Sequence, residues 1–143
     1  MKMDVRQRNK NRGYQQLHVW SDAVELDRLT CESVKGWSFE MKKIASQAIA
    51  SADSVHRNIA EGYCRRSIKE YIQFLYTALG SLGESVSGYI AFKAAGQISP
   101  QTFEALDALA FKLENGLLKL VESLERKRDV SDWQDSLRQP EPE

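Results

Sequence analysis

The stretch that decides the fold is SVHRNIAEGYCRRSIKEYIQFLYTALGSLGE, residues 54–84. It predicts the end of one helix, a short basic turn and the start of a long second helix. Gly62 is expected to end the first helix, because glycine tolerates the left-handed backbone that terminates helices. Ser67 and Glu70 form a capping box at the start of the second, in which each side chain bonds to the other residue's amide. The stretch therefore predicts a helical hairpin.

Apolar residues recur at helical spacing in four segments of the chain, two of which form this hairpin. The segments cover residues 17–34, 38–61, 67–95 and 100–124. Ser38, Ser67 and Ser99 stand at N-cap positions, and Pro100 takes the first helical position, where proline is favoured. Short connections and the lack of any strand signal predict an all-α protein, an up-down-up-down four-helix bundle.

We assign the bundle to residues 14–128 and treat residues 1–13 as a flexible basic arm. Residues 129–143 form a C-terminal tail that is expected to be partly disordered. One apolar triplet in this region, Val130, Trp133 and Leu137, is predicted to form a helical turn that docks on this or a neighbouring chain.

Small residues concentrate inside the third helical segment, which includes Gly80, Ser81, Gly83 and Gly88. Each glycine costs roughly 1 kcal/mol against alanine in a helix interior. We therefore expect another helix to lie very close to this side, either within the bundle or between subunits.

Composition is that of a globular protein, with 42% apolar and 28% charged residues. The formal net charge is zero, so the chain lacks the basic excess of a typical nucleic-acid binder. Charge is unevenly distributed, however, at +4 over residues 1–13 and −4 over residues 101–143. No apolar run approaches the ~20 residues that span a bilayer, and no secretion signal is evident. We expect a cytoplasmic protein in which Cys31 and Cys64 are free thiols.

The titratable residues do not suggest an enzyme. His18 and His56 lie on different predicted helices, and no glutamate stands three residues before a histidine as in di-iron bundles. No phosphate-binding glycine loop is present either. We expect no catalytic residues, no metal and no cofactor.

Basic residues gather around the predicted hairpin turn. We call Arg57, Arg65, Arg66 and Lys69 the basic rim, and Tyr63 and Tyr71 lie nearby in sequence for base stacking. The rim is either a nucleic-acid-binding surface or simply a solvated hairpin end. Lys42 and Lys43, off the apolar seam of the second segment, are further nucleic-acid-binding candidates. The run 126–128, Arg-Lys-Arg, suits either the negative end of the last helix or a nucleic-acid patch.

Polar residues near the turn are candidates for structural or interface roles. Asn58 and Glu61 are expected to fix the hairpin angle by bonding the turn, Arg65 or the next helix, or to form part of a partner surface. Glu84 is expected to pair with a basic residue of an adjacent helix or subunit. The full structural or interface set is Asn58, Glu61, Gly62, Tyr63, Ser67, Glu70, Gly80, Ser81 and Glu84.

The motif NIAEG at residues 58–62, the motif GSLGE at 80–84 and the Leu17-x-Val19-Trp20 start resemble a family of four-helix bundle proteins. That family was first named for intervening sequences in bacterial 23S ribosomal RNA genes. The resemblance spans roughly residues 17–125. His56 stands where the family usually has proline, and Lys35-Gly36-Trp37 replaces its usual Phe-Pro pair.

The resemblance implies a ring-like cyclic homo-oligomer, typically a pentamer. It also implies an association with nucleic acid, and relatives serve as accessory subunits of reverse transcriptases in diversity-generating retroelements. Our leading hypothesis is a non-enzymatic homo-oligomeric bundle that binds or scaffolds RNA or DNA through the basic rim. The alternative is a protein–protein adaptor, such as a reverse-transcriptase accessory subunit.

Overall fold

A computed structural model describes residues 10–130 of the chain, and these residues are almost entirely helical. Four α-helices follow in order: α2 (His18–Ser33), α3 (Lys42–Tyr63), α4 (Ile68–Ala94) and α5 (Pro100–Val130). Two 3-10 segments, η1 (Lys10–Gln16) and η2 (Phe39–Met41), precede α2 and α3. No strand occurs between residues 10 and 130. The all-α prediction is confirmed, while Trp133 and Leu137 lie outside the described residues.

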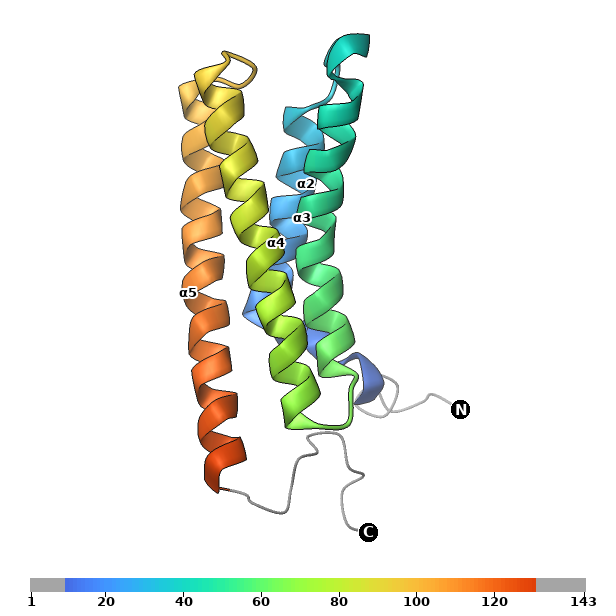
Figure 1. Cartoon of the computed structure of the whole chain (residues 1–143), viewed down its shortest axis with the longest axis vertical. Helices are drawn as coiled ribbons and strands as arrows, with labels where there is room; N and C mark the ends of the chain where they lie inside the picture. The colour runs from blue at the N-terminus through green and yellow to red at the C-terminus, as the bar shows by residue number, and fades with distance from the viewer. Residues whose placement is uncertain (1–9, 131–143) are drawn as a thin grey trace, which may run out of the picture.

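The helices run up, down, up and down along one long axis (Figure 1). Each packs against its neighbour in sequence, and α5 closes the bundle by packing against α2. Four residues connect α3 to α4, and five connect α4 to α5. Connections this short make each of these pairs of helices antiparallel neighbours. The predicted up-down-up-down topology is therefore confirmed.

The core lies on the axis of the bundle and is built from the apolar seams of all four helices. Its side chains that are less than 2% exposed include Leu26, Val55, Ile59, Leu75, Leu106, Leu113 and Leu117. Burying one such side chain stabilises the fold by roughly 1.5–3 kcal/mol. One polar contact sits among them, since Tyr89 and Thr30 share a hydrogen bond of 2.5 Å. Thr30 also donates to the Leu26 carbonyl, so the tyrosine hydroxyl donates to Thr30.

Local hydrogen bonds define two helix starts at the predicted serines. The Ser67 hydroxyl accepts from the Glu70 amide at 3.0 Å, as expected. The return bond differs from the predicted capping box, because the Glu70 carboxylate accepts from the Ser67 hydroxyl at 3.3 Å and not from the Ser67 amide. The Ser99 hydroxyl accepts from the Thr102 amide at 3.0 Å. Ser38 differs, since it precedes η2 without a side-chain cap bond and α3 begins only at Lys42.

The expectation that Gly62 ends its helix is wrong. The helix continues to Tyr63, and among the described residues only Gly36 and Gly96 have positive φ, at 79° and 74°. Gly62 is instead buried where α3 meets α4. A Cβ built on it would lie 2.7 Å from the Phe74 Cβ, so glycine is needed there for packing and not for a turn.

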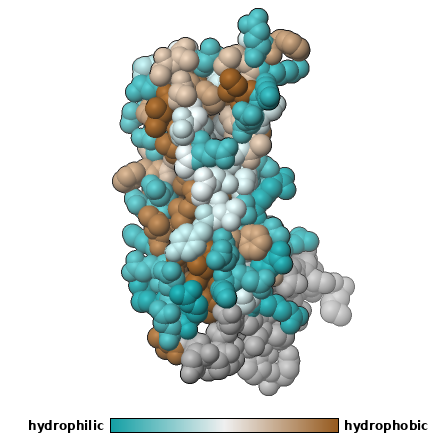
Figure 2. Space-filling model, in the orientation of Figure 1, coloured by the Kyte–Doolittle hydropathy of each residue, from teal (hydrophilic) through white to brown (hydrophobic). Residues whose placement is uncertain are grey.

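The small residues of α4 divide into two sets. Ser81 bonds to Ser54 of α3 at 2.9 Å and Ser85 is buried, so this part of the small-residue side does meet a helix of the same chain. Gly80 and Gly83 have open space beside them, because a Cβ on either would have no atom of another helix within 4 Å among residues 10–130. A band of residues of intermediate hydropathy runs along the α4 face beside an apolar band (Figure 2).

Candidate functional site

The basic rim lies at the end of the bundle where α3 turns into α4 (Figure 1). Two of its arginines are engaged by acids on α3. Arg57 forms an ion pair with Asp53, and Arg65 pairs with Glu61 at 2.8 Å and lies over the Phe74 ring, 4.9 Å from its centroid. Asp53 and Arg57 stand four residues apart, which places both side chains on one face of α3. The cationic surface of the rim is partly neutralised by its own helix.

The C-terminal end of α5 brings a second set of basic residues to the same end of the bundle (Figure 1). We call residues 126–128 the α5 basic run. The Tyr76 hydroxyl of α4 donates to the Glu125 carboxylate at 3.2 Å, which ties this end of α5 to α4. Arg126 pairs with Glu122 at 2.7 Å, whereas Lys127 is exposed. About 60 residues of sequence separate the basic rim from the α5 basic run, yet both lie at the same end of the bundle.

Lys42 and Lys43 lie far from this surface. They begin α3, whereas the rim lies at its far end, and at 1.5 Å per residue about 30 Å of helix separates them. The Lys42 ammonium lies 5.8 Å from the centroid of the Phe39 ring. The structure therefore does not bring these two candidates together with the basic rim.

The expectation that Tyr63 and Tyr71 are available for base stacking does not hold for Tyr71. Tyr71 is buried, and its ring lies 5.9 Å from that of Tyr63 in an edge-to-face contact. Tyr63 in turn meets Tyr14 of η1 at 6.2 Å. A Cβ on Gly13 would lie 2.1 Å from the Tyr63 hydroxyl, so η1 packs directly on the hairpin. Helical structure begins at Lys10, inside the segment expected to be a flexible arm.

Asn58 and Glu61 have structural partners. The Asn58 side-chain amide donates to the Ser54 carbonyl at 2.8 Å and to its hydroxyl at 2.9 Å. Because Ser54 also bonds to Ser81, this chain of contacts links α3 to α4. Glu61 accepts from Arg65, as expected for a residue that holds the turn. Glu84 is exposed and has no ion-pair partner within residues 10–130.

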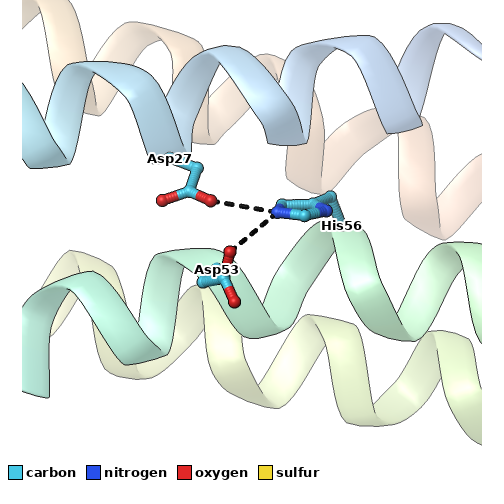
Figure 3. A group of neighbouring side chains, drawn as sticks. All are labelled: Asp27, Asp53 and His56. Carbon is cyan, nitrogen blue, oxygen red and sulfur yellow. Dashed lines mark hydrogen bonds and ion pairs between the residues drawn. The ribbon is translucent and has the colours of Figure 1, made fainter.

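Sequence reasoning missed a cluster of three side chains between α2 and α3 (Figure 3). The Nε2 atom of His56 lies 2.9 Å from an oxygen of Asp27 and 3.0 Å from an oxygen of Asp53. The side chains are 18%, 17% and 32% exposed, so water is only partly excluded. We call these residues the Asp-Asp-His cluster.

The two carboxyl groups of the cluster have opposite pKa shifts. Burial raises the pKa of Asp27, and a hydrogen bond with Asp53 raises it further. Burial alone would also raise the pKa of Asp53, but hydrogen bonds with Asp27, Arg57 and His56 together lower it. As the pH falls, Asp27, which is the more buried of the two, therefore takes up a proton before Asp53 does.

One local signal pointed to this cluster. Asp53 precedes His56 by three residues, a spacing that puts both on one face of a helix. Asp27, however, comes from α2, and only the packing of α2 on α3 brings it to the histidine. Cys31, one turn further along α2, has its Sγ 3.7 Å from an Asp27 oxygen. Cys31 and Cys64 are exposed thiols that form no disulfide within residues 10–130, as expected.

The fold and this end of the bundle define a small all-α protein, a four-helix bundle that carries two groups of basic residues at one end. None of the helices between residues 10 and 130 is both long and apolar enough to cross a membrane. The chain belongs to the 23S rRNA-intervening sequence protein family, whose model matches residues 15–119. This confirms the family resemblance, and the relationship to retroelement accessory proteins stays a prediction. No curated protein matches the chain.

Proposed function

We propose that this chain is a non-enzymatic helical-bundle protein that binds RNA through the basic rim and the α5 basic run. Membership of a family named for ribosomal RNA intervening sequences is loosely consistent with RNA association. The observation that carries the proposal is the placement of the two basic runs at one end of the bundle. The net charge of the chain is zero, so the proposal depends on where the basic residues lie and not on their excess over acidic residues.

Arg66 and Lys127 are the exposed members of the two runs for which no acidic partner is found among residues 10–130. Cations of this kind bind phosphates by displacing condensed counterions, so the proposed binding weakens steeply with salt. Arg57 and Arg65 contribute less, since Asp53 and Glu61 already neutralise them. The proposed interface is therefore centred on the α3–α4 turn and the end of α5.

Self-association is part of the proposal, because a single copy offers a small cationic surface. The open α4 face at Gly80 and Gly83 supports it, since small residues let two helices approach closely. In a cyclic assembly the basic ends of several copies lie on one side, and linked weak sites bind a long RNA far more tightly than one site does. We expect such an assembly in the cytoplasm, a pentamer by family resemblance.

The test is fluorescence anisotropy with a labelled single-stranded RNA over a range of salt concentrations. Arg65→Ala combined with Arg66→Ala removes two positive charges from the rim, and Lys42→Ala combined with Lys43→Ala removes two from the opposite end of α3. The rim variant is expected to bind more weakly and to lower the salt slope by about 0.7, the value for one lost phosphate contact, because Glu61 already neutralises Arg65. The control variant should keep the wild-type slope.

If both double variants lose binding equally, binding depends on the total charge of the protein and not on the rim, and the rim is removed from the proposal. Unchanged binding in the rim variant would remove it as well. A duplex DNA of equal length serves as the competitor. If the protein binds this DNA more tightly than the RNA, DNA replaces RNA as the proposed ligand.

A second candidate function is a protein–protein adaptor, such as an accessory subunit of a retroelement reverse transcriptase. Exposed apolar side chains favour it, since Ile90 is 54% and Phe111 66% exposed. Nucleic acid would not be expected to cover such groups. Co-purification with a co-expressed reverse transcriptase that is lost in Phe111→Asp, together with no RNA binding at low salt, would favour the adaptor.

A further inference from the structure

We propose that Asp27, Asp53 and His56 bind one divalent transition-metal ion of the Zn²⁺ class, which joins α2 to α3. This site is separate from the proposed RNA interface and would act in addition to it. Its three donors come from two helices, and one ligand atom from each lies within 4.8 Å of the other two. Figure 3 shows both carboxylates directed at the same nitrogen of the imidazole ring.

The spacing of the donor atoms is close to what such an ion requires. Zn²⁺ binds histidine nitrogen and carboxylate oxygen at about 2.0–2.2 Å, so two ligand atoms in a tetrahedral site lie about 3.4 Å apart. The nitrogen–oxygen distances are 2.9 and 3.0 Å. Ion entry therefore needs each contact to lengthen by only about 0.5 Å, which small side-chain rotations provide.

Without a cation, the cluster is incompletely satisfied. A neutral imidazole has one Nε2 proton to offer, yet two carboxylate oxygens approach that nitrogen. The two carboxylates also repel each other in a partly desolvated place, which is consistent with the raised pKa of Asp27. A divalent ion bound to the nitrogen lone pair and to one oxygen of each carboxylate would neutralise both charges at once.

Neighbouring side chains already hold the outer oxygen of each carboxylate. Arg57 bonds Oδ2 of Asp53 and leaves Oδ1 toward His56, while Cys31 contacts Oδ1 of Asp27 and leaves Oδ2 toward His56. Such outer contacts orient ligands in metal sites. The Arg57 side chain is 71% exposed, so solvent screens the repulsion between its charge and the ion.

The donor set indicates the class of ion. One imidazole nitrogen with two carboxylate oxygens suits Zn²⁺ or Co²⁺, whereas Mg²⁺ and Ca²⁺ prefer oxygen alone. Three protein ligands leave a fourth position for water. An open surface cleft lined by Trp20, His56, Ala60 and Cys64 lies beside the site and gives the ion a path from solvent.

The experiment is isothermal titration of the chelator-treated full-length chain with ZnCl₂, followed by Co²⁺ absorption spectroscopy. The chain has two histidines, so His18→Ala is a matched control for His56→Ala. We expect one ion per chain for the wild type and for His18→Ala. His56→Ala should bind at least tenfold more weakly, and Asp53→Asn, which keeps the shape of the side chain, should do the same. Zn²⁺ should raise the melting temperature of the wild type and of His18→Ala, but not that of His56→Ala or Asp53→Asn.

The proposal is overturned if the wild type binds no Zn²⁺ saturably, or if His56→Ala and Asp53→Asn bind it as tightly as the wild type. Loss of binding in His18→Ala would place the ion elsewhere. Cys31→Ser is expected to bind normally, and a tenfold loss in that variant would show that the three-residue ligand set is wrong. Circular dichroism of each metal-free variant checks the fold, and Asp53→Asn decides the question if His56→Ala is unfolded.

Discussion

Replacing Gly62 by alanine is expected to destabilise the bundle, although the same change in an ordinary helix interior would stabilise it. Gly62 is buried in α3, and an added Cβ would lie 2.7 Å from the Cβ of Phe74, 3.1 Å from Cδ1 of Tyr71 and 3.2 Å from its carbonyl oxygen. None of these atoms is the far end of a flexible side chain. The new methyl can therefore be accommodated only if α3 and α4 separate near their turn.

The magnitude follows from two opposing terms. Overpacking of this kind costs about 1–3 kcal/mol, and a contact with atoms close to the backbone belongs near the upper value. Alanine regains about 1 kcal/mol through its better helix propensity. The free energy of unfolding should thus fall by about 2 kcal/mol, which lowers the melting temperature by about 6–10 °C for a chain of this size.

Urea unfolding followed by circular dichroism measures this change, at a protein concentration where sedimentation shows monomers. Gly83→Ala is the matched control, because Gly83 is also inside a helix but has open space around it. The control is expected to gain about 1 kcal/mol in the monomer. A Gly62→Ala variant as stable as the wild type would refute the packing argument. At higher concentration, Gly83→Ala should weaken self-association if the α4 face is the contact between copies.

Two further predictions concern hydrogen bonds. Tyr89→Phe removes the buried bond to Thr30 and should cost about 1 kcal/mol in urea unfolding. Burial raises the pKa of Tyr89, so stability is complete below about pH 10 and falls as the pH rises through the raised value. The difference between wild type and Tyr89→Phe should shrink over that range, and a constant difference would contradict the assignment. Ser67→Ala should lower the free energy of unfolding by about 1 kcal/mol, because it removes the cap on the Glu70 amide. Ser67→Asp should be nearly neutral, since aspartate also caps that amide. Equal losses in the two variants would exclude the cap.

Much of the fold was predictable because helices are specified locally. The helical spacing of apolar residues over 67–95 and the Ser67 cap predicted the bounds of α4 to within one residue. The predicted topology also held, since short loops force antiparallel neighbours. The errors came where one residue type serves two purposes. Gly62 sits next to a helix end, so its sequence position suggested a turn, whereas its role is to let α3 and α4 approach.

The candidate sites were less predictable. The basic rim was identified from its own sequence, but its neutralisation by Asp53 and Glu61 appears only when side-chain positions are known. Lys42 and Lys43 were grouped with it by residue type, and the length of α3 separates them.

The sequence by itself determined four helices, their caps and the face that each turns toward the core, because these features depend on residues within a few positions of one another. Only the tertiary structure decided which polar side chains meet across helices. Asp27 reaches His56, and residues 126–128 reach the end that carries the α3–α4 turn. Such meetings depend on the rotation and axial offset of one packed helix against another, which the whole core sets and no local pattern records.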